Sequence, residues 1–84
     1  MRKTINNPEW CYLCGSTAQN IHEIFYGRNR QLSIKYGLMV ALCFNCHRYI
    51  HDNPKSPQDL KLRELGYGYF EEHYPELDFI EIFK

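Results

Sequence analysis

The chain has 84 residues and a mass of 10.1 kDa, which is the size of one domain. So short a chain rarely buries enough apolar surface to fold by packing alone, so we expect disulfides, a metal or a partner chain to add stability. Hydrophobic residues make up 44% of the sequence, which excludes a disordered chain, and the longest apolar run covers only residues 38–44, which excludes a membrane span.

Ten basic and ten acidic residues cancel, but they are unevenly distributed. Residues 1–55 carry seven basic and three acidic groups, for a net charge of +4, and residues 56–84 carry three basic and seven acidic groups, for a net charge of −4. This polarity is typical of a protein with one functional and one solubilising half, and equally of two ordinary solvated faces.

The first half of the chain predicts five elements in order: a loose N-terminal arm anchored by Trp10 (1–10), a tight turn (11–15), a strand (20–26), a helical turn (32–36) and a buried second strand (38–42). Gly37 is expected to end the helical turn. The two strands therefore predict a hairpin that lies between two pairs of cysteines.

The second half predicts helices. Residues 43–52 fit a helix that ends at Asn53-Pro54. Ser56 is expected to cap the next helix, which runs to Pro75, with Pro57 in its first turn and Asp59 completing a variant of the capping box. Gly66 and Gly68 each weaken this helix by about 1 kcal/mol relative to alanine. A last short element is expected within 77–83, either a helix or a strand, with a helix preferred. The predicted fold class is α+β.

The four cysteines form two C-x-x-C pairs, Cys11 with Cys14 and Cys43 with Cys46. The first residues, Met1 to Thr4, are not followed by an apolar segment, so no secretory signal is predicted and the expected location is cytoplasmic. Reducing conditions favour a metal over two disulfides, which are the alternative. Two such pairs suit a tetrahedral structural Zn²⁺, and their positions around the hairpin predict a treble clef.

Three histidines are expected to meet beside the cysteines. His47 and His51 follow the second cysteine pair and share one face of the predicted helix. His22 lies on the first strand next to Glu23, and a zinc ion that ties the hairpin to the helix would bring it close to the other two. A metal ion held by two or three imidazoles keeps open coordination positions, which suits metal-assisted hydrolysis. The alternative for each of these histidines is an ordinary surface or core position. For His73 this alternative is the preferred interpretation.

A family resemblance is carried by two stretches: Ile21-His22-Glu23-Ile24-Phe25-Tyr26-Gly27, and Arg30-x-x-Ser33-x-Lys35-Tyr36-Gly37-Leu38-x-Val40-x-Leu42-Cys43-x-x-Cys46-His47-x-x-x-His51. They resemble the small HNH-type endonuclease-like proteins of phages and prophages. The resemblance covers about residues 11–52 and implies a ββα-metal site on a treble clef that hydrolyses DNA phosphodiester bonds. Residues 53–84 resemble the helical tail of such proteins, so we expect a single domain over 1–84 with a zinc-bound core at 11–52 and a helical extension at 53–84.

The resemblance also implies a role for each site residue. His47 matches the last histidine of the motif, a metal ligand, and His51 matches a position that adds a ligand in some members. On the first strand, His22 is implied as a metal ligand with Glu23 in the place of the general base. A shift by one residue makes His22 the base and Glu23 a ligand or an orienting group. The metal at this site would be Mg²⁺, Mn²⁺ or another divalent ion. The resemblance also implies that the protein acts in the cytoplasm of a bacterial host cell or a phage-infected cell.

DNA is the implied partner, and four basic residues are candidate phosphate contacts: Arg28, Arg30, Lys35 and Arg48. A solvated surface is the alternative for each of them. The central asparagine of the family motif falls near Leu38, with Asn29 and Asn45 as the nearest replacements. Three functions therefore stay open: an HNH-like endonuclease, a non-catalytic zinc module that binds DNA or a protein, and a zinc scaffold with no role on nucleic acid.

Overall fold

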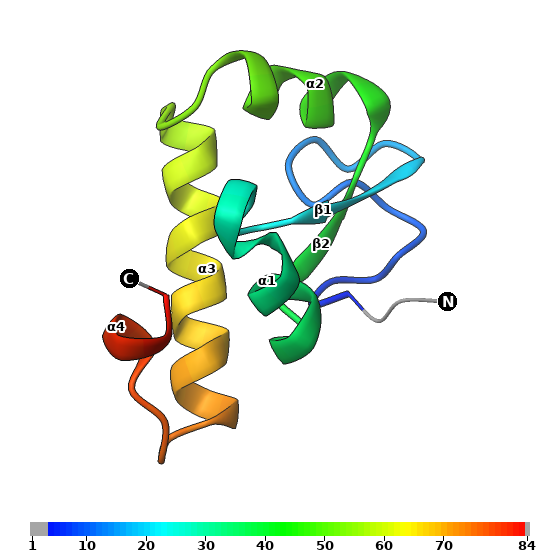
Figure 1. Ribbon diagram of the computed structural model, residues 1–84. Coiled ribbons are helices and arrows are strands. Elements are labelled where there is room, and N and C mark those ends of the chain that lie inside the picture. Colours follow the sequence, from blue (N-terminus) through cyan, green and yellow to red (C-terminus); the bar gives the residue numbers. More distant parts are fainter. Residues whose placement is uncertain (1–3, 84) are drawn as a thin grey trace.

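The computed structural model describes residues 4–83 and has the predicted α+β architecture, a two-stranded sheet surrounded by helices (Figure 1). Its elements are β1 (Asn20–Glu23), the 3-10 helix η1 (Gly27–Asn29), α1 (Arg30–Tyr36), β2 (Met39–Leu42), α2 (Phe44–Asp52), α3 (Pro57–His73) and α4 (Phe79–Ile82). The start of the expected arm, with its basic residues Arg2 and Lys3, lies outside the described residues. None of the helices within 4–83 is long and apolar enough to cross a membrane.

The predicted hairpin is present, with antiparallel strands. Its register pairs Asn20 with Leu42, Ile21 with Ala41, His22 with Val40 and Glu23 with Met39. The strand predicted over 38–42 is buried along its whole length. The N-terminal arm runs beside it, because Ile5 N–H donates to the Met39 carbonyl at 2.7 Å and Ala41 N–H donates to the Asn6 side chain at 2.8 Å. Residues 5–6 are therefore held by the sheet rather than loose.

The first strand ends earlier than the predicted range of 20–26. The backbone N–H of Phe25 donates to the Ser33 hydroxyl at 3.0 Å, and the same hydroxyl donates to the Phe25 carbonyl at 2.8 Å. Both backbone groups of Phe25 are thus satisfied by a buried side chain of α1, and the strand ladder stops. Gly37 ends α1 in the left-handed conformation, with φ of 72°, as predicted.

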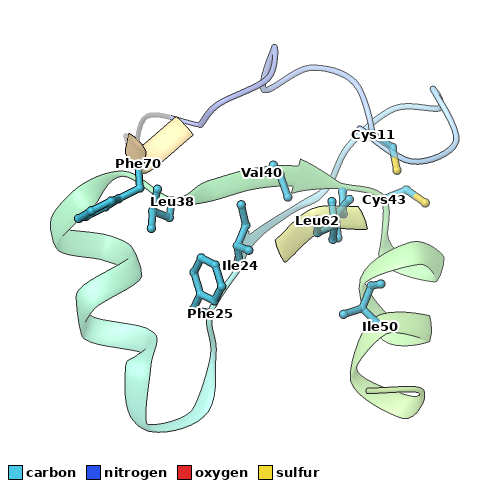
Figure 2. Close-up of a cluster of buried hydrophobic side chains, with 10 residues drawn as sticks. Cys11, Ile24, Phe25, Leu38, Val40, Cys43, Ile50, Leu62 and Phe70 are labelled. Atoms are coloured by element: carbon cyan, nitrogen blue, oxygen red, sulfur yellow. The ribbon is translucent and has the colours of Figure 1, made fainter. Parts of the chain in front are cut away.

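The apolar core lies between the hairpin, α2 and α3 (Figure 2). Figure 2 shows Ile24 and Val40 of the hairpin region pointing toward Leu62 of α3, with Ile50 of α2 beside them. Trp10, predicted as the anchor of the arm, is instead 50% exposed. It pairs through its backbone with Thr17, which fixes the turn while leaving the indole outside the core.

The start of α3 follows the predicted signals with one change. The Ser56 hydroxyl accepts a hydrogen bond from Asp59 N–H at 3.3 Å, and Pro57 occupies the first turn. In a capping box the acidic side chain would accept from the N–H of the capping residue. Here the Asp59 carboxylate accepts from Lys55 N–H instead, at 2.9 Å, and lies completely buried. The acidic residue therefore has a role beyond capping.

Several acidic residues lie close together at one end of α3. Figure 1 shows α2 crossing the region where α3 begins, and α4 packed against the later part of α3. Four acidic residues lie at the far end of α3 and in the turn that follows it: Glu71, Glu72, Glu76 and Asp78. The acidic half predicted from composition is thus concentrated at the end of the molecule away from α2.

Gly66 and Gly68 differ in their surroundings. A Cβ atom at Gly66 would lie 3.0 Å from Phe25 Cε2 and 3.1 Å from Ile24 Cγ2, whereas a Cβ at Gly68 would meet no atom within 4 Å. Gly66 therefore allows α3 to approach the end of β1 closely, and its cost in helix propensity has a structural reason.

We expect Gly68→Ala to raise the free energy of unfolding by about 0.5–1 kcal/mol, because only the helix propensity changes. Gly66→Ala should lower it by about 1–2 kcal/mol, because the buried Phe25 and Ile24 side chains must move. Urea unfolding monitored by circular dichroism measures both values. Equal stabilisation by the two substitutions would contradict the close approach at Gly66.

Candidate metal centres

The four cysteines come together as predicted. Their sulfur atoms all lie within 4.8 Å of one another, and the Cys14 and Cys43 sulfurs are 3.6 Å apart. All four are free thiols rather than disulfides. The cluster joins the turn before β1 to the start of α2, which are 29 residues apart between Cys14 and Cys43.

Local backbone geometry aims each pair of sulfurs at a common point. In the first turn, Gly15 adopts φ of 79° and its N–H donates to the Cys11 carbonyl at 2.9 Å. In the second, Cys43 caps α2, and Cys46 N–H donates to the Cys43 sulfur at 3.4 Å. Cys14 N–H makes the equivalent bond to the Cys11 sulfur at 3.5 Å. Both pairs thus use the same device, a backbone N–H directed at the first sulfur of the pair.

Hydrogen bonds favour the thiolate form at part of this cluster. The Ser16 hydroxyl lies 3.0 Å from the Cys14 sulfur, and this contact lowers the pKa of Cys14 to about 6. The Cys46 backbone N–H lowers the pKa of Cys43, whereas burial raises the pKa of Cys46. Metals bind thiolates rather than thiols, so a lowered thiol pKa favours metal binding. Four sulfur ligands suit one metal ion that prefers tetrahedral coordination.

Three histidines form a second cluster. One ring nitrogen from each of His22, His47 and His51 lies within 4.8 Å of the other two. The Nε2 atoms of His47 and His51 are 3.1 Å apart, one helical turn from each other on α2. The His22 ring centroid lies 5.2 Å from that of His47 and 5.3 Å from that of His51. The predicted convergence of these imidazoles is therefore present.

His22 is a buried polar group without a protein partner. Its residue is 1% exposed, and neither Nδ1 nor Nε2 has a hydrogen-bond partner among residues 4–83. Burial, together with the positive charges that His47 and His51 can carry, lowers the pKa of His22 to about 3, so its imidazole is neutral. A buried group of this kind is costly unless something binds it, and a neutral imidazole is a metal ligand. The donor set thus fits a second metal ion.

Glu23 is not part of the histidine cluster. Its carboxylate accepts a hydrogen bond from Arg30 Nε at 3.2 Å and its side chain is 14% exposed. Successive residues of a strand point to opposite faces, so Glu23 and His22 cannot project in the same direction from β1. Burial and the neighbouring His51 lower the pKa of His47, and the Glu23 carboxylate lies near enough to oppose part of this lowering.

The predicted phosphate contacts are dispersed. Arg30 is paired with Glu23, and Arg48 with Asp52 at 3.6 Å. Lys35 lies over the Tyr36 ring, 5.4 Å from its centroid, and Arg28 lies in η1. The positions of these side chains leave the prediction of DNA contact untested.

The two asparagines that were expected as replacements near Leu38 form no hydrogen bond with the histidines among the described residues. The expected position, Leu38, is completely buried in the core. The Asn29 side-chain amide donates to the Phe83 carbonyl at 3.4 Å, and Asn45 lines a small apolar depression with Leu13 and Tyr49. The Asn29 amide is therefore engaged by the C-terminal segment, whereas Asn45 is exposed on α2.

Sequence reasoning missed a polar group that borders the histidines. The Tyr26 ring lies 5.1 Å from the His51 ring and 5.6 Å from the His22 ring, measured between centroids. Its hydroxyl donates to the buried Asp59 carboxylate at 3.0 Å, which Arg63 also contacts at 3.3 Å. The only sequence signal was the spacing of Asp59 and Arg63, which places an acid and a base on one face of a helix.

No family model, curated protein or solved structure matches this chain. The assignment of chemistry therefore depends on the two clusters and their surroundings.

We expect removal of metal from the cysteine cluster to unfold the protein, because the binding energy of a closed four-thiolate site, about 10–16 kcal/mol in small zinc modules, is folding energy. Circular dichroism should show loss of helix on addition of a strong chelator and its recovery when Zn²⁺ is restored. Cys46→Ser should give the same result without chelator, whereas His51→Ala should stay folded. A chelated, metal-free protein with unchanged helix content would contradict this role.

Proposed function

We propose that this chain is a metal-dependent endonuclease of the HNH type, found in phages or prophages, that hydrolyses DNA phosphodiester bonds. The observation that carries the proposal is the convergence of three histidines, one of them buried and unpartnered, beside a separate cluster of four cysteines. The order of elements supports it as well: a cysteine turn, a hairpin, a second cysteine turn and a helix are the order expected for the treble clef that we propose.

The four cysteines are proposed to hold a structural Zn²⁺. Four thiolates complete a tetrahedral shell and leave no position for water or substrate, so this ion would stabilise the fold and take no part in the reaction. Its place between the first turn and α2 supports this role, because α2 carries both His47 and His51. The fold and the second site would therefore depend on the same ion.

His22, His47 and His51 are proposed to hold a divalent metal for the reaction. Three imidazoles leave coordination positions open, and the bound ion would supply charge stabilisation to the phosphate and its leaving oxygen. Imidazole is a better ligand for transition metals than for Mg²⁺, which prefers carboxylate oxygens. Mn²⁺ or Zn²⁺ is thus favoured over Mg²⁺ by the donor set.

Glu23 is proposed as the group that takes the proton from the attacking water. His22 is enclosed and faces the other two imidazoles, which suits a ligand better than a base that must meet water. Glu23 keeps partial exposure and lies within electrostatic range of His47. Arg30 would orient the carboxylate through its hydrogen bond. This assignment corresponds to the first of the two registers implied by the family resemblance.

We expect the zinc-loaded protein to nick supercoiled plasmid when Mn²⁺ is added, and His47→Ala to reduce the rate by about 100-fold or more through loss of a ligand. His73→Ala is the matched control, because this fourth histidine stacks on Tyr69 and lies outside the cluster. Gel analysis of the time course measures the rates. Identical behaviour of wild type and His47→Ala would refute the enzyme.

Glu23→Gln should lower the cleavage rate by about 100- to 10,000-fold, the range of general-base catalysis, and leave metal binding intact. Isothermal titration with Mn²⁺ provides the binding measurement, and Arg30→Gln serves as a milder variant that removes only the orienting contact. Full activity in Glu23→Gln would instead place the base at His22, in agreement with the shifted register.

A non-catalytic zinc module that binds DNA or a protein is the second candidate. Two observations favour it: the buried Leu38 replaces the motif asparagine, and the Glu23 carboxylate is engaged by Arg30. In that case wild type would bind a DNA duplex but nick no plasmid with any divalent metal. The plasmid assay therefore separates the two functions.

A further inference from the structure

We infer that Arg63 and Tyr26 form a phosphate-binding subsite beside the three histidines, and that the buried Asp59 is the positioning residue that holds it together. This inference rests on the proposed function and names where the DNA backbone would be gripped. It also assigns a role in the site to α3, within the extension to which the family resemblance gives no chemistry.

Asp59 is the centre of the arrangement. Its side chain is completely buried, and its Oδ2 atom accepts hydrogen bonds from the Tyr26 hydroxyl at 3.0 Å, Lys55 N–H at 2.9 Å and Arg63 Nε at 3.3 Å. A buried carboxylate is costly unless it is paired and hydrogen-bonded, so three donors on Oδ2 hold this group in place, while Oδ1 has no hydrogen-bond partner among residues 4–83. Capping does not explain it, because Ser56 already caps α3.

Arg63 is fixed at two points but remains accessible. Its Nε bonds Asp59, and its Cζ lies 5.2 Å from the centre of the Tyr26 ring, so the guanidinium is both ion-paired and stacked. The side chain is still 35% exposed. Asp59 engages Nε, and the Tyr26 hydroxyl also hydrogen-bonds the guanidinium. The remaining N–H groups of the exposed part of the side chain are the ones that would bind a phosphate.

Tyr26 connects this guanidinium to the histidines. The same ring that stacks with Arg63 lies 5.1 Å from the His51 ring and 5.6 Å from the His22 ring. One aromatic ring therefore lies between the arginine and the imidazoles. A phosphate bound at the histidine cluster would lie beside a preorganised cation.

The other arginines are less well placed for this role. Arg48 has a 71% exposed side chain, and its 3.6 Å pair with Asp52 is a surface contact of small energetic value. Arg30 is directed to Glu23. Compared with Arg30 and Arg48, Arg63 combines a buried partner, a position over the Tyr26 ring and, through that ring, proximity to His22.

The test compares Arg63→Gln with Lys61→Gln. Both remove one positive charge from α3, but Lys61 lies over the Tyr12 ring, at 5.8 Å, away from the histidines. Binding of a fluorescent DNA duplex by the zinc-loaded protein is measured by anisotropy over a range of salt concentrations, with no other divalent ion added.

We expect Arg63→Gln to weaken binding about 10-fold and to reduce the slope of log K against log salt by about 0.9, the value for one lost phosphate contact. Lys61→Gln should change neither quantity. Arg63→Lys keeps the positive charge but lacks the planar guanidinium that binds a phosphate with two hydrogen bonds. This variant should therefore keep the wild-type slope of log K against log salt but bind DNA more weakly than wild type. Equal affinities and slopes for the two glutamine variants would overturn the subsite.

The role of Asp59 is tested by a double-mutant cycle. If Asp59 acts only by positioning Arg63, Asp59→Asn weakens DNA binding by itself but adds nothing to Arg63→Gln. Full additivity would refute the positioning role. Should Asp59→Asn fail to fold by circular dichroism, Tyr26→Phe removes the other side-chain donor to that carboxylate and is expected to lower affinity less than Arg63→Gln.

The outcome is separable from the test of nuclease activity. Arg63-dependent DNA binding without plasmid cleavage would refute the endonuclease and keep the subsite, whereas cleavage with an unchanged affinity in Arg63→Gln would refute the subsite alone. Competition by inorganic phosphate distinguishes the source of the ligand: weak competition supports a DNA phosphate, and phosphate binding without duplex binding would overturn the assignment to DNA.

Discussion

The convergence of four sulfur atoms is the constraint on which the rest of this structure depends. The chain between the two cysteine pairs folds back as a hairpin, so the contact between the sulfur atoms at its two ends links the turn before β1 to the start of α2. His22 comes from the first of these elements and His47 and His51 from the second. A small rotation of α2 would move His47 and His51 away from His22. The geometry of the histidine cluster therefore depends on the cysteine cluster. Residues 43–51 contain two of the four cysteines and two of the three histidines, so this short segment belongs to both clusters.

The core explains why so small a chain can maintain a polar site. Leu62 and Phe70 of α3 pack against the hairpin, and Gly66 lets the helix approach the end of β1. This contact buries Asp59 and brings its carboxylate to the Tyr26 hydroxyl. The helical extension thus closes one side of the histidine cluster, and its packing is part of what defines the site.

Local patterns predicted much of this architecture. The C-x-x-C spacing, the i and i+4 positions of His47 and His51, Gly37 as a helix end and Ser56 as a cap each depend on a few neighbouring residues, and all are found as predicted. Features that depend on distant contacts were not predictable. The early end of β1 is caused by Ser33, eight residues beyond Phe25, and the environment of Asp59 by Tyr26, 33 residues before it. The exposure of Trp10 was likewise not predictable from its local sequence.

The concentration of acidic residues beyond the end of α3 has a further physical consequence. Four carboxylates lie at and beyond the end of α3, and the elements that carry the cysteine and histidine clusters lie toward its beginning, so charge is unevenly placed along the long helix. In the field of any polyanion such a molecule experiences a torque before contact, and it turns its acidic extremity outward. The surface that arrives first is then the one formed by α2 and the beginning of α3.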